Sequence, residues 1–218
     1  FLNPFWTLEK LFNQTYKMRK RKIELHQFIE NYFEKAGIVT ESEPFDIDFI
    51  YKTPSELSGG QAQRVMIALV LSKEPRLIVA DESTTGLDVT TQKIIIDTFN
   101  NIRRLDPEIT MIFISHDFGF LTHVVDEYYV LYGGFICDHI ADRNRLFSEI
   151  SELHPYTQDL ISSLKVDDTS NHKEELSISV DLSEELKGCP YYSECKLKNS
   201  NDKLEDLCRS AVPPITNK

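Results

Sequence analysis

Two carboxylates follow an apolar run in the stretch RLIVADE, which ends with Asp81 and Glu82. A short continuous apolar run of this kind predicts a strand that is buried on both faces of a parallel sheet. In open parallel sheets, functional groups gather beyond the carboxyl ends of the strands. Adjacent carboxylates at that edge can hold Mg2+, or orient and deprotonate an attacking water. The structural alternative is a strand end that simply meets solvent with acidic residues.

A second apolar run, TMIFISH, ends in His116 and predicts another buried strand. If the two strands are neighbours, His116 lies near Glu82. An imidazole in that place can donate a hydrogen bond to a terminal phosphate or position the water. A histidine at a strand end can equally be structural, so the histidine alone does not decide the function.

A glycine-rich turn, LSGGQ, precedes a helix that we expect over residues 61–71. Ser58 can cap this helix, and Gly59 and Gly60 let the backbone approach an anion closely. The N–H groups and the positive dipole end of the helix favour a phosphate, beside which Gln61 would lie. The alternative is an ordinary glycine-rich turn that caps a helix.

The remaining pattern predicts an α/β protein whose mainly parallel sheet is covered by helices. Residues 1–56 are expected to be mostly helical, with a helix that ends at Gly37. Further helices are expected at 89–105, 117–125, 143–150 and 155–164, the first with Ile94, Ile95, Phe99 and Ile102 inward, and two strands flank the turn Gly133-Gly134. We expect a helical part at 1–60, a core at 61–165 and a C-terminal extension at 166–218, with a polar linker near 165–186.

Composition and charge limit the classes of partner. The formal net charge is -11, which disfavours binding of nucleic acid through the overall field. The basic run Lys17, Arg19, Lys20, Arg21, Lys22 predicts a solvated helix face, with docking of a partner as the alternative. The longest apolar runs fall short of the roughly 18 residues that span a bilayer.

Taken together, the order and spacing of these segments strongly resemble the ATP-binding-cassette (ABC) ATPases. Leu57–Gln61 resembles the signature motif, Leu77–Asp81 the Walker B strand, and residues 85–88 the D-loop. The resemblance implies that Glu82 is the catalytic glutamate, His116 the switch histidine and Asp81 a ligand of Mg2+. It also implies that Asp88 links two nucleotide sites, and that Ser58, Gly59, Gly60 and Gln61 bind the ATP of a partner cassette.

Details near both ends are similar to the oligopeptide, dipeptide and nickel importer ATPases. These are FLNP at residues 1–4, HPYT at 154–157 and GCPYYSEC at 188–195. In relatives, such tail cysteines can ligate an iron–sulfur cluster, which implies Cys189, Cys195 and Cys208 as candidate ligands, with Cys137 as a distant fourth. The alternative is that these cysteines are ordinary small apolar residues of the tail.

The phosphate-binding loop is not among these residues, because no glycine of the sequence is followed by lysine, as GxxxxGK[ST] requires. The resemblance therefore leads us to expect the C-terminal part of a longer ATPase, without the Walker A and Q-loop regions, or one product of a split gene. The isolated 218 residues are expected to hydrolyse little ATP.

The resemblance further implies membrane permease subunits and a second ATPase, identical or different, as partners. A substrate-binding protein would act indirectly, and the location would be the cytoplasmic face of the membrane. The sequence does not decide whether the transported substrate is a peptide or nickel. It also leaves open a soluble ABC protein that serves DNA repair or translation, and a non-hydrolysing half-cassette that acts as an interaction module.

Overall fold

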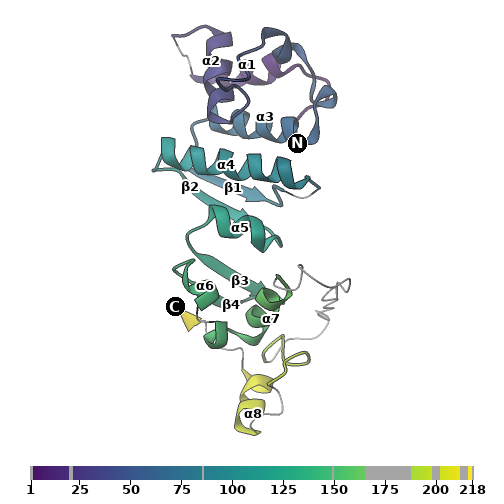
Figure 1. Ribbon diagram of the computed structural model, residues 1–218, viewed down its shortest axis with the longest axis vertical. Helices are drawn as coiled ribbons and strands as arrows, with labels where there is room; N and C mark the ends of the chain where they lie inside the picture. Colours follow the sequence, from purple (N-terminus) through teal and green to yellow (C-terminus); the bar gives the residue numbers. More distant parts are fainter. Residues whose placement is uncertain are drawn as a thin grey trace. The chain divides into compact units, whose positions relative to one another are not determined.

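The computed structural model describes residues 2–19, 22–84, 86–148, 150–164, 188–197, 202–211 and 216–217. The chain divides into two compact units, Phe1–Val124 and Val125–Lys218 (Figure 1). The linker predicted near residues 165–186 lies outside the described residues, as do Thr85 of the predicted D-loop and Lys20 and Arg21 of the basic run.

The first unit begins with helices, as the apolar spacing predicts. They are α1 (Leu8–Arg19), α2 (Leu25–Lys35), the 3-10 turns η1 (Ile47–Tyr51) and η2 (Pro54–Glu56), and α3 (Gly59–Leu71). Aromatic contacts join α1, α2 and η1: the buried Phe33 of α2 meets the buried Phe12 of α1 edge-on at 5.5 Å between centroids, and it meets the half-buried Phe49 of η1 at 5.9 Å. Gly37, at φ +66°, ends α2 as predicted.

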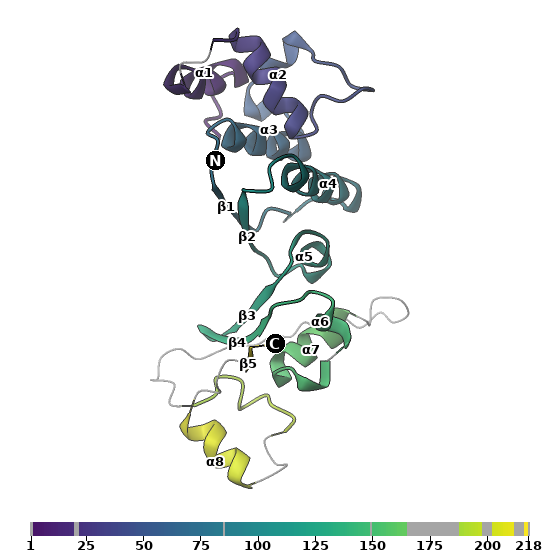
Figure 2. The ribbon, with the colours of Figure 1, turned by 90° about the vertical axis from the view of Figure 1, so that its left-hand side faces the viewer.

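A parallel strand pair follows, formed by β1 (Leu77–Asp81) and β2 (Thr110–Ile114). The register pairs Leu77 with Thr110 and Asp81 with Ile114, so both strands end at the same edge. Between them in sequence runs α4 (Val89–Leu105), with the predicted bounds, and α5 (Phe118–Val124) follows β2. Both helices cover the same face of the pair, where Phe113 meets Phe99 at 4.8 Å and Phe120 at 5.6 Å (Figures 1 and 2).

The prediction that these strands are buried on both faces is wrong for the described residues. The face opposite α4 and α5 carries Leu77, Val79, Ile112 and Ile114, and these side chains are 48% to 57% exposed. Only the covered face follows the expectation, as Ile78 is 8% exposed. Ile94 of α4 was expected inward and is 38% exposed, whereas Ile95 is fully buried. A continuous apolar run therefore indicates that both faces of a strand can be buried, but here the face opposite α4 and α5 is open to solvent.

The second unit contains an antiparallel hairpin. Its strands are β3 (Tyr128–Tyr132) and β4 (Phe135–Ile140), joined at Gly133-Gly134 as predicted. The other elements are α6 (Arg145–Ser148), η3 (Ile150–Glu152), α7 (Pro155–Leu164), α8 (Asp202–Ser210) and β5 (Thr216–Asn217), which pairs with β4. The helix α8 in the tail was not predicted.

The HPYT segment starts α7 and binds it to the hairpin through a buried carboxylate. Asp138 of β4 is fully buried, and its Oδ2 accepts hydrogen bonds from the backbone N–H of His154 (2.9 Å) and the hydroxyl of Thr157 (2.6 Å). Because a buried carboxylate needs donors, these contacts explain why the segment requires a residue such as Thr157 at its end.

The cysteine-bearing tail packs on this unit through a tyrosine. Tyr191 is 2% exposed and meets the rings of Tyr132 at 5.2 Å and Tyr156 at 5.4 Å. Its hydroxyl donates to Asp159 of α7 (2.7 Å), and Asp159 also pairs with Lys196. The tail is thus held by an aromatic cluster and by polar contacts at its edge.

Candidate functional site

The carboxyl ends of β1 and β2 form one edge of the strand pair, and we call this the site edge. Asp81 is the last residue of β1 and is exposed. Glu82 follows with φ +49°, a left-handed conformation that is uncommon outside glycine. Its N–H donates to the carbonyl of Ile114 (2.8 Å), so the turn is bound to the end of β2. Local strain held by neighbouring structure is typical of functional positions.

Glu82 and His116 meet at this edge, as the strand order led us to expect. The distance between Glu82 Oε1 and His116 Nδ1 is 3.0 Å. The hydrogen bond and charge of Glu82 raise the pKa of His116 above its usual value. Both side chains are open to solvent, 78% exposed for His116 and 42% for Glu82, so the surrounding water weakens the pair. An exposed acid–imidazole pair is accessible to a ligand that arrives from solution.

The turn Leu57–Gln61, which we call the signature turn, starts α3 with a reciprocal cap. The Gln61 N–H donates to Ser58 Oγ (3.3 Å), and the Ser58 N–H donates to Gln61 Oε1 (3.0 Å). Ser58 and Gly59 are exposed, and Gly60 and Gln61 are half-buried. The N–H groups of Gly59 and Gly60 belong to the first turn, which has no intrahelical acceptor for them. The start of α3 can therefore present N–H groups to an anion.

Asp88 caps α4 at the end of the segment that follows Glu82. Its carboxylate accepts from the Thr91 N–H (3.0 Å) and the Thr91 hydroxyl (2.6 Å). These hydrogen bonds, led by the one from the hydroxyl, lower the pKa of Asp88. Asp88 is exposed, and it is ionised at neutral pH. The carboxylate is thus held in one orientation by the first turn of α4.

The first turn of α4 also reaches the end of β2, a contact that sequence reasoning missed. The Gln92 amide donates to Oδ2 of Asp117, the residue after His116. Asp117 Oδ1 in turn accepts from the N–H of Phe120 (2.9 Å) and caps α5. Thr91 and Gln92 carry no motif in the sequence, and only their position on the first helical turn after Asp88 would have suggested them.

The tail cysteines do not form a metal centre in the part of the chain that the structure describes. Among those residues, no three side chains of His, Cys, Asp or Glu gather in a way that could hold a metal ion. Cys189 Sγ lies 3.6 Å from His154 Nε2, and the Cys189 N–H donates to the carbonyl of Cys208 (2.7 Å). Burial raises the pKa of the Cys189 and Cys208 thiols, and that of Cys137 to about 12. Because no three candidate ligands gather among the described residues, the tail cysteines do not fit the implied iron–sulfur group.

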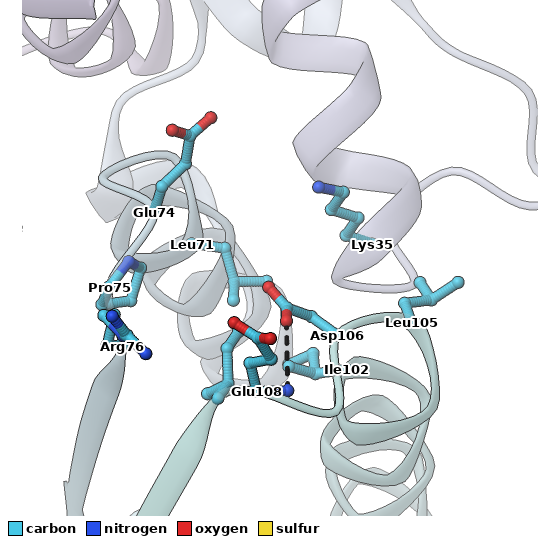
Figure 3. A pocket seen from close by; sticks show the side chains of 10 residues that line it. Lys35, Leu71, Glu74, Pro75, Arg76, Ile102, Leu105, Asp106 and Glu108 are labelled. Atoms are coloured by element: carbon cyan, nitrogen blue, oxygen red, sulfur yellow. Dashed lines mark hydrogen bonds between the residues drawn. The ribbon is translucent and has the colours of Figure 1, made fainter.

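A hollow of about 420 Å3 lies at the opposite end of the strand pair (Figure 3). Its lining includes Arg76 just before β1 and Asp106, Glu108 and Ile109 just before β2. The Glu108 N–H donates to Asp106 Oδ1 (3.3 Å). None of the site-edge or signature-turn residues lines this hollow, so it is separate from the candidate site.

Part of the chain matches a known protein family, and its fold is similar to that of a solved structure. Residues 3–85, which contain the signature turn, β1 and Glu82, match the family "ABC transporter". This segment is therefore similar to part of an ABC transporter, and the chain has the α/β fold of a partial ABC cassette. A putative metal-chelate type ABC transporter of known structure supports this fold, with a TM-score of 0.54 at 18% identity over 67% of this chain and 57% of that one.

Curated relatives of this ABC transporter segment are named as peptide transport proteins. A probable peptide ABC transporter ATP-binding protein of Sinorhizobium fredii is 34% identical, over 74% of this chain and 44% of that protein. An oligopeptide transport ATP-binding protein of Bacillus subtilis is 29% identical, over 97% of this chain and 61% of that protein. The chain spans about half the length of the curated relatives it matches.

Within the described residues, every helix is too short or too polar to cross a membrane.

Proposed function

We propose that this chain contributes the hydrolytic edge and the signature turn to the ATP-hydrolysing subunit of an ABC importer for peptides. The observation that carries the proposal is the pairing of Glu82 with His116 at the site edge, 3.0 Å apart. The family match and the names of the curated relatives support the class of transporter. A nickel importer remains the alternative that transport assays must exclude.

In the proposed reaction, water attacks the γ-phosphoryl group in line, and negative charge spreads over its oxygens. Glu82 accepts a hydrogen bond from the water and draws its proton away. His116, whose pKa Glu82 raises, is protonated over a wider pH range and donates a hydrogen bond to the γ-phosphate. Positioning and charge stabilisation thus come from side chains that the strand ends hold in place.

Asp81 would hold Mg2+, which in such sites is bound by one or two carboxylates together with phosphate oxygens and water. The position fits, because Asp81 is exposed at the end of β1 directly before Glu82. When bound, the ion neutralises charge on the phosphates. We propose no role for an iron–sulfur cluster, since the described tail residues do not fit one.

Ser58, Gly59, Gly60 and Gln61 would clamp the ATP held by a partner cassette, and Asp88 would link the two sites. The exposed start of α3 supports this role because an anion can reach its N–H groups from outside. The 218 residues contain no GxxxxGK[ST] sequence, so alone they offer a signature turn but no loop for a nucleotide of their own. Purified chain should therefore hydrolyse no more ATP than its Glu82→Gln variant. A clear excess of the unaltered chain over that variant would contradict this part of the proposal.

The open face of the strand pair supports the view that another segment completes the site. Parallel sheets are normally covered on both faces, and side chains such as Val79 and Ile112 are too apolar to favour solvent. We infer that the polypeptide segment bearing the phosphate-binding loop covers this face in the working enzyme. Its loop would then stand near the site edge, where Asp81 and Glu82 lie.

The proposed partners are integral membrane permease subunits and a second ATPase, with a substrate-binding protein acting through the permease. The proposed location is the cytoplasmic face of the membrane. The test is uptake of a labelled peptide by vesicles that contain the assembled transporter, with 63Ni2+ uptake measured in parallel. ATP-dependent peptide uptake that Glu82→Gln abolishes supports the proposal. Uptake of nickel alone, or of neither, would contradict peptide transport.

A further inference from the structure

Thr91 makes two different contacts from one side chain. Its hydroxyl donates to Asp88 Oδ2 (2.6 Å), beside the hydrogen bond from its N–H to Oδ1 (3.0 Å). Two donors on one carboxylate fix both the position and the rotation of Asp88. The polar side of Thr91 thus controls a residue that has a proposed role across the cassette interface.

The methyl group of Thr91 faces the signature turn. A Cβ built on Gly60 would overlap Thr91 Cγ2, and it would lie 3.6 Å from both Thr91 Cβ and Thr91 Oγ1. The methyl therefore occupies the space that the missing side chain of Gly60 leaves open. By contrast, a Cβ on Gly59 would meet only Leu87 Cδ2, at an ordinary 3.9 Å. The apolar side of Thr91 thus sets how closely α4 approaches Gly60.

We propose that Thr91 is a positioning residue that fixes Asp88 through its hydroxyl and the signature turn through its methyl group. Threonine is β-branched, so hydroxyl and methyl are attached to the same carbon and cannot rotate independently. When the hydroxyl binds Asp88, the methyl is directed at Gly60. The inference rests on the proposed function only for its catalytic consequence, because the two contacts stand by themselves.

Single substitutions separate the two contacts. Thr91→Val keeps the branched shape and the methyl against Gly60 but removes the hydroxyl from Asp88. Thr91→Ser keeps the hydroxyl and removes the methyl. Thr90→Val is the matched control, since Thr90 is exposed and adjacent in the same helical turn.

The first measurement is made on the chain itself and does not depend on ATP hydrolysis. Carbon-13 NMR titration of the Asp88 carboxyl should give a raised pKa in Thr91→Val and an unchanged pKa in Thr91→Ser and Thr90→Val. Hydrogen exchange at the Gln61 amide, which donates to Ser58 Oγ, should accelerate only in Thr91→Ser. Equal behaviour of all variants would overturn the proposed positioning, whatever the function of the protein.

The second measurement is made on the assembled ATPase pair, by which we mean the two proposed ATPase subunits together, with the segment that bears the phosphate-binding loop present. Thr91→Val should lower kcat roughly threefold to tenfold with little change in KM, since it loosens a residue whose proposed contact serves the chemical step. Thr91→Ser should instead raise the KM for ATP by a similar factor, since it loosens a phosphate clamp. If both variants change kcat and KM in the same way, Thr91 has only a general structural role, and the proposal is overturned. If the unaltered pair shows no ATPase that depends on Glu82, the proposed function fails, while the NMR result still decides the positioning.

Discussion

Gly60 should tolerate alanine far less well than Gly59, although both lie in the first turn of α3. An alanine Cβ at Gly59 would make one ordinary contact, at 3.9 Å from Leu87 Cδ2. At Gly60 the same carbon would overlap the methyl of Thr91, whose rotation is held by Asp88. The pair of variants therefore isolates the cost of that overlap.

The expected magnitude follows from two opposing contributions. Replacing glycine by alanine in a helix stabilises by about 0.5–1 kcal/mol. Overpacking a filled space typically costs about 1–3 kcal/mol. Gly59→Ala should thus be neutral or slightly stabilising, and Gly60→Ala should be about 1–3 kcal/mol less stable than Gly59→Ala, since only the overlap differs.

The assay is urea unfolding followed by the fluorescence of Trp6, the only tryptophan of the chain, which lies half-buried in the first unit. With a urea dependence of about 2 kcal/mol per M, the difference between the variants should be roughly 0.5–1.5 M in unfolding midpoint. Thr91→Ser removes the overlapping methyl, so it should restore most of the stability that Gly60→Ala loses. Coincident midpoints for Gly59→Ala and Gly60→Ala, or no rescue by Thr91→Ser, would refute the reasoning.

Two further predictions concern single contacts. NMR should show that the pKa of His116 lies above that of an exposed histidine, and that it falls towards the ordinary value in Glu82→Gln. Because the folded-state pKa of His116 is raised, the pair stabilises the fold fully at pH values below the pKa of the unfolded state. This stabilisation is lost as the pH rises through the pKa of the folded state. An unshifted His116 in the unaltered chain would contradict the contact. Tyr191→Phe should destabilise the tail by about 1–2 kcal/mol, because the hydrogen bond to Asp159 is lost at a buried position, and limited proteolysis of the tail should accelerate. The exposed Tyr129→Phe should leave the proteolysis rate unchanged, and equal rates for the two variants would contradict the anchoring role.

Much of the fold could be predicted from local signals. The helix Val89–Leu105 begins after an aspartate that can cap it, and its ends agree with the prediction. The glycine pair at 133–134 marked the hairpin, and Gly37 marked the end of α2. The meeting of Glu82 with His116 followed from the rule that parallel strands end at one edge.

The errors arise where the outcome depends on which surfaces meet. The apolar strand runs indicated burial on two faces, but whether a face such as that of Val79 is covered depends on elements outside the strand. The inward prediction for Ile94 was wrong because it lies at the edge of the helical stripe. The sequence directs attention to the cysteines of the tail as candidate ligands. The structure shows that Tyr191, which lies between Cys189 and Cys195, is the buried residue that packs against Tyr132 of the hairpin.

Thr91 and Gln92 were missed for a different reason. Threonine and glutamine are common at the start of exposed helices, so neither residue type signals a task. Their contacts with Gly60 and Asp117 join segments far apart in sequence, and only the folded unit brings them together.

The most direct test of the account is the steady-state rate of ATP hydrolysis by the assembled ATPase pair with Glu82→Gln. Removing the group that draws the proton from water should lower kcat roughly 100-fold or more while ATP still binds. Glu108→Gln is the matched control, since Glu108 is exposed at the other end of the strand pair. A large loss of kcat in Glu82→Gln alone is the predicted result. Equal rates for the two variants would contradict the claim that the site edge performs the hydrolysis.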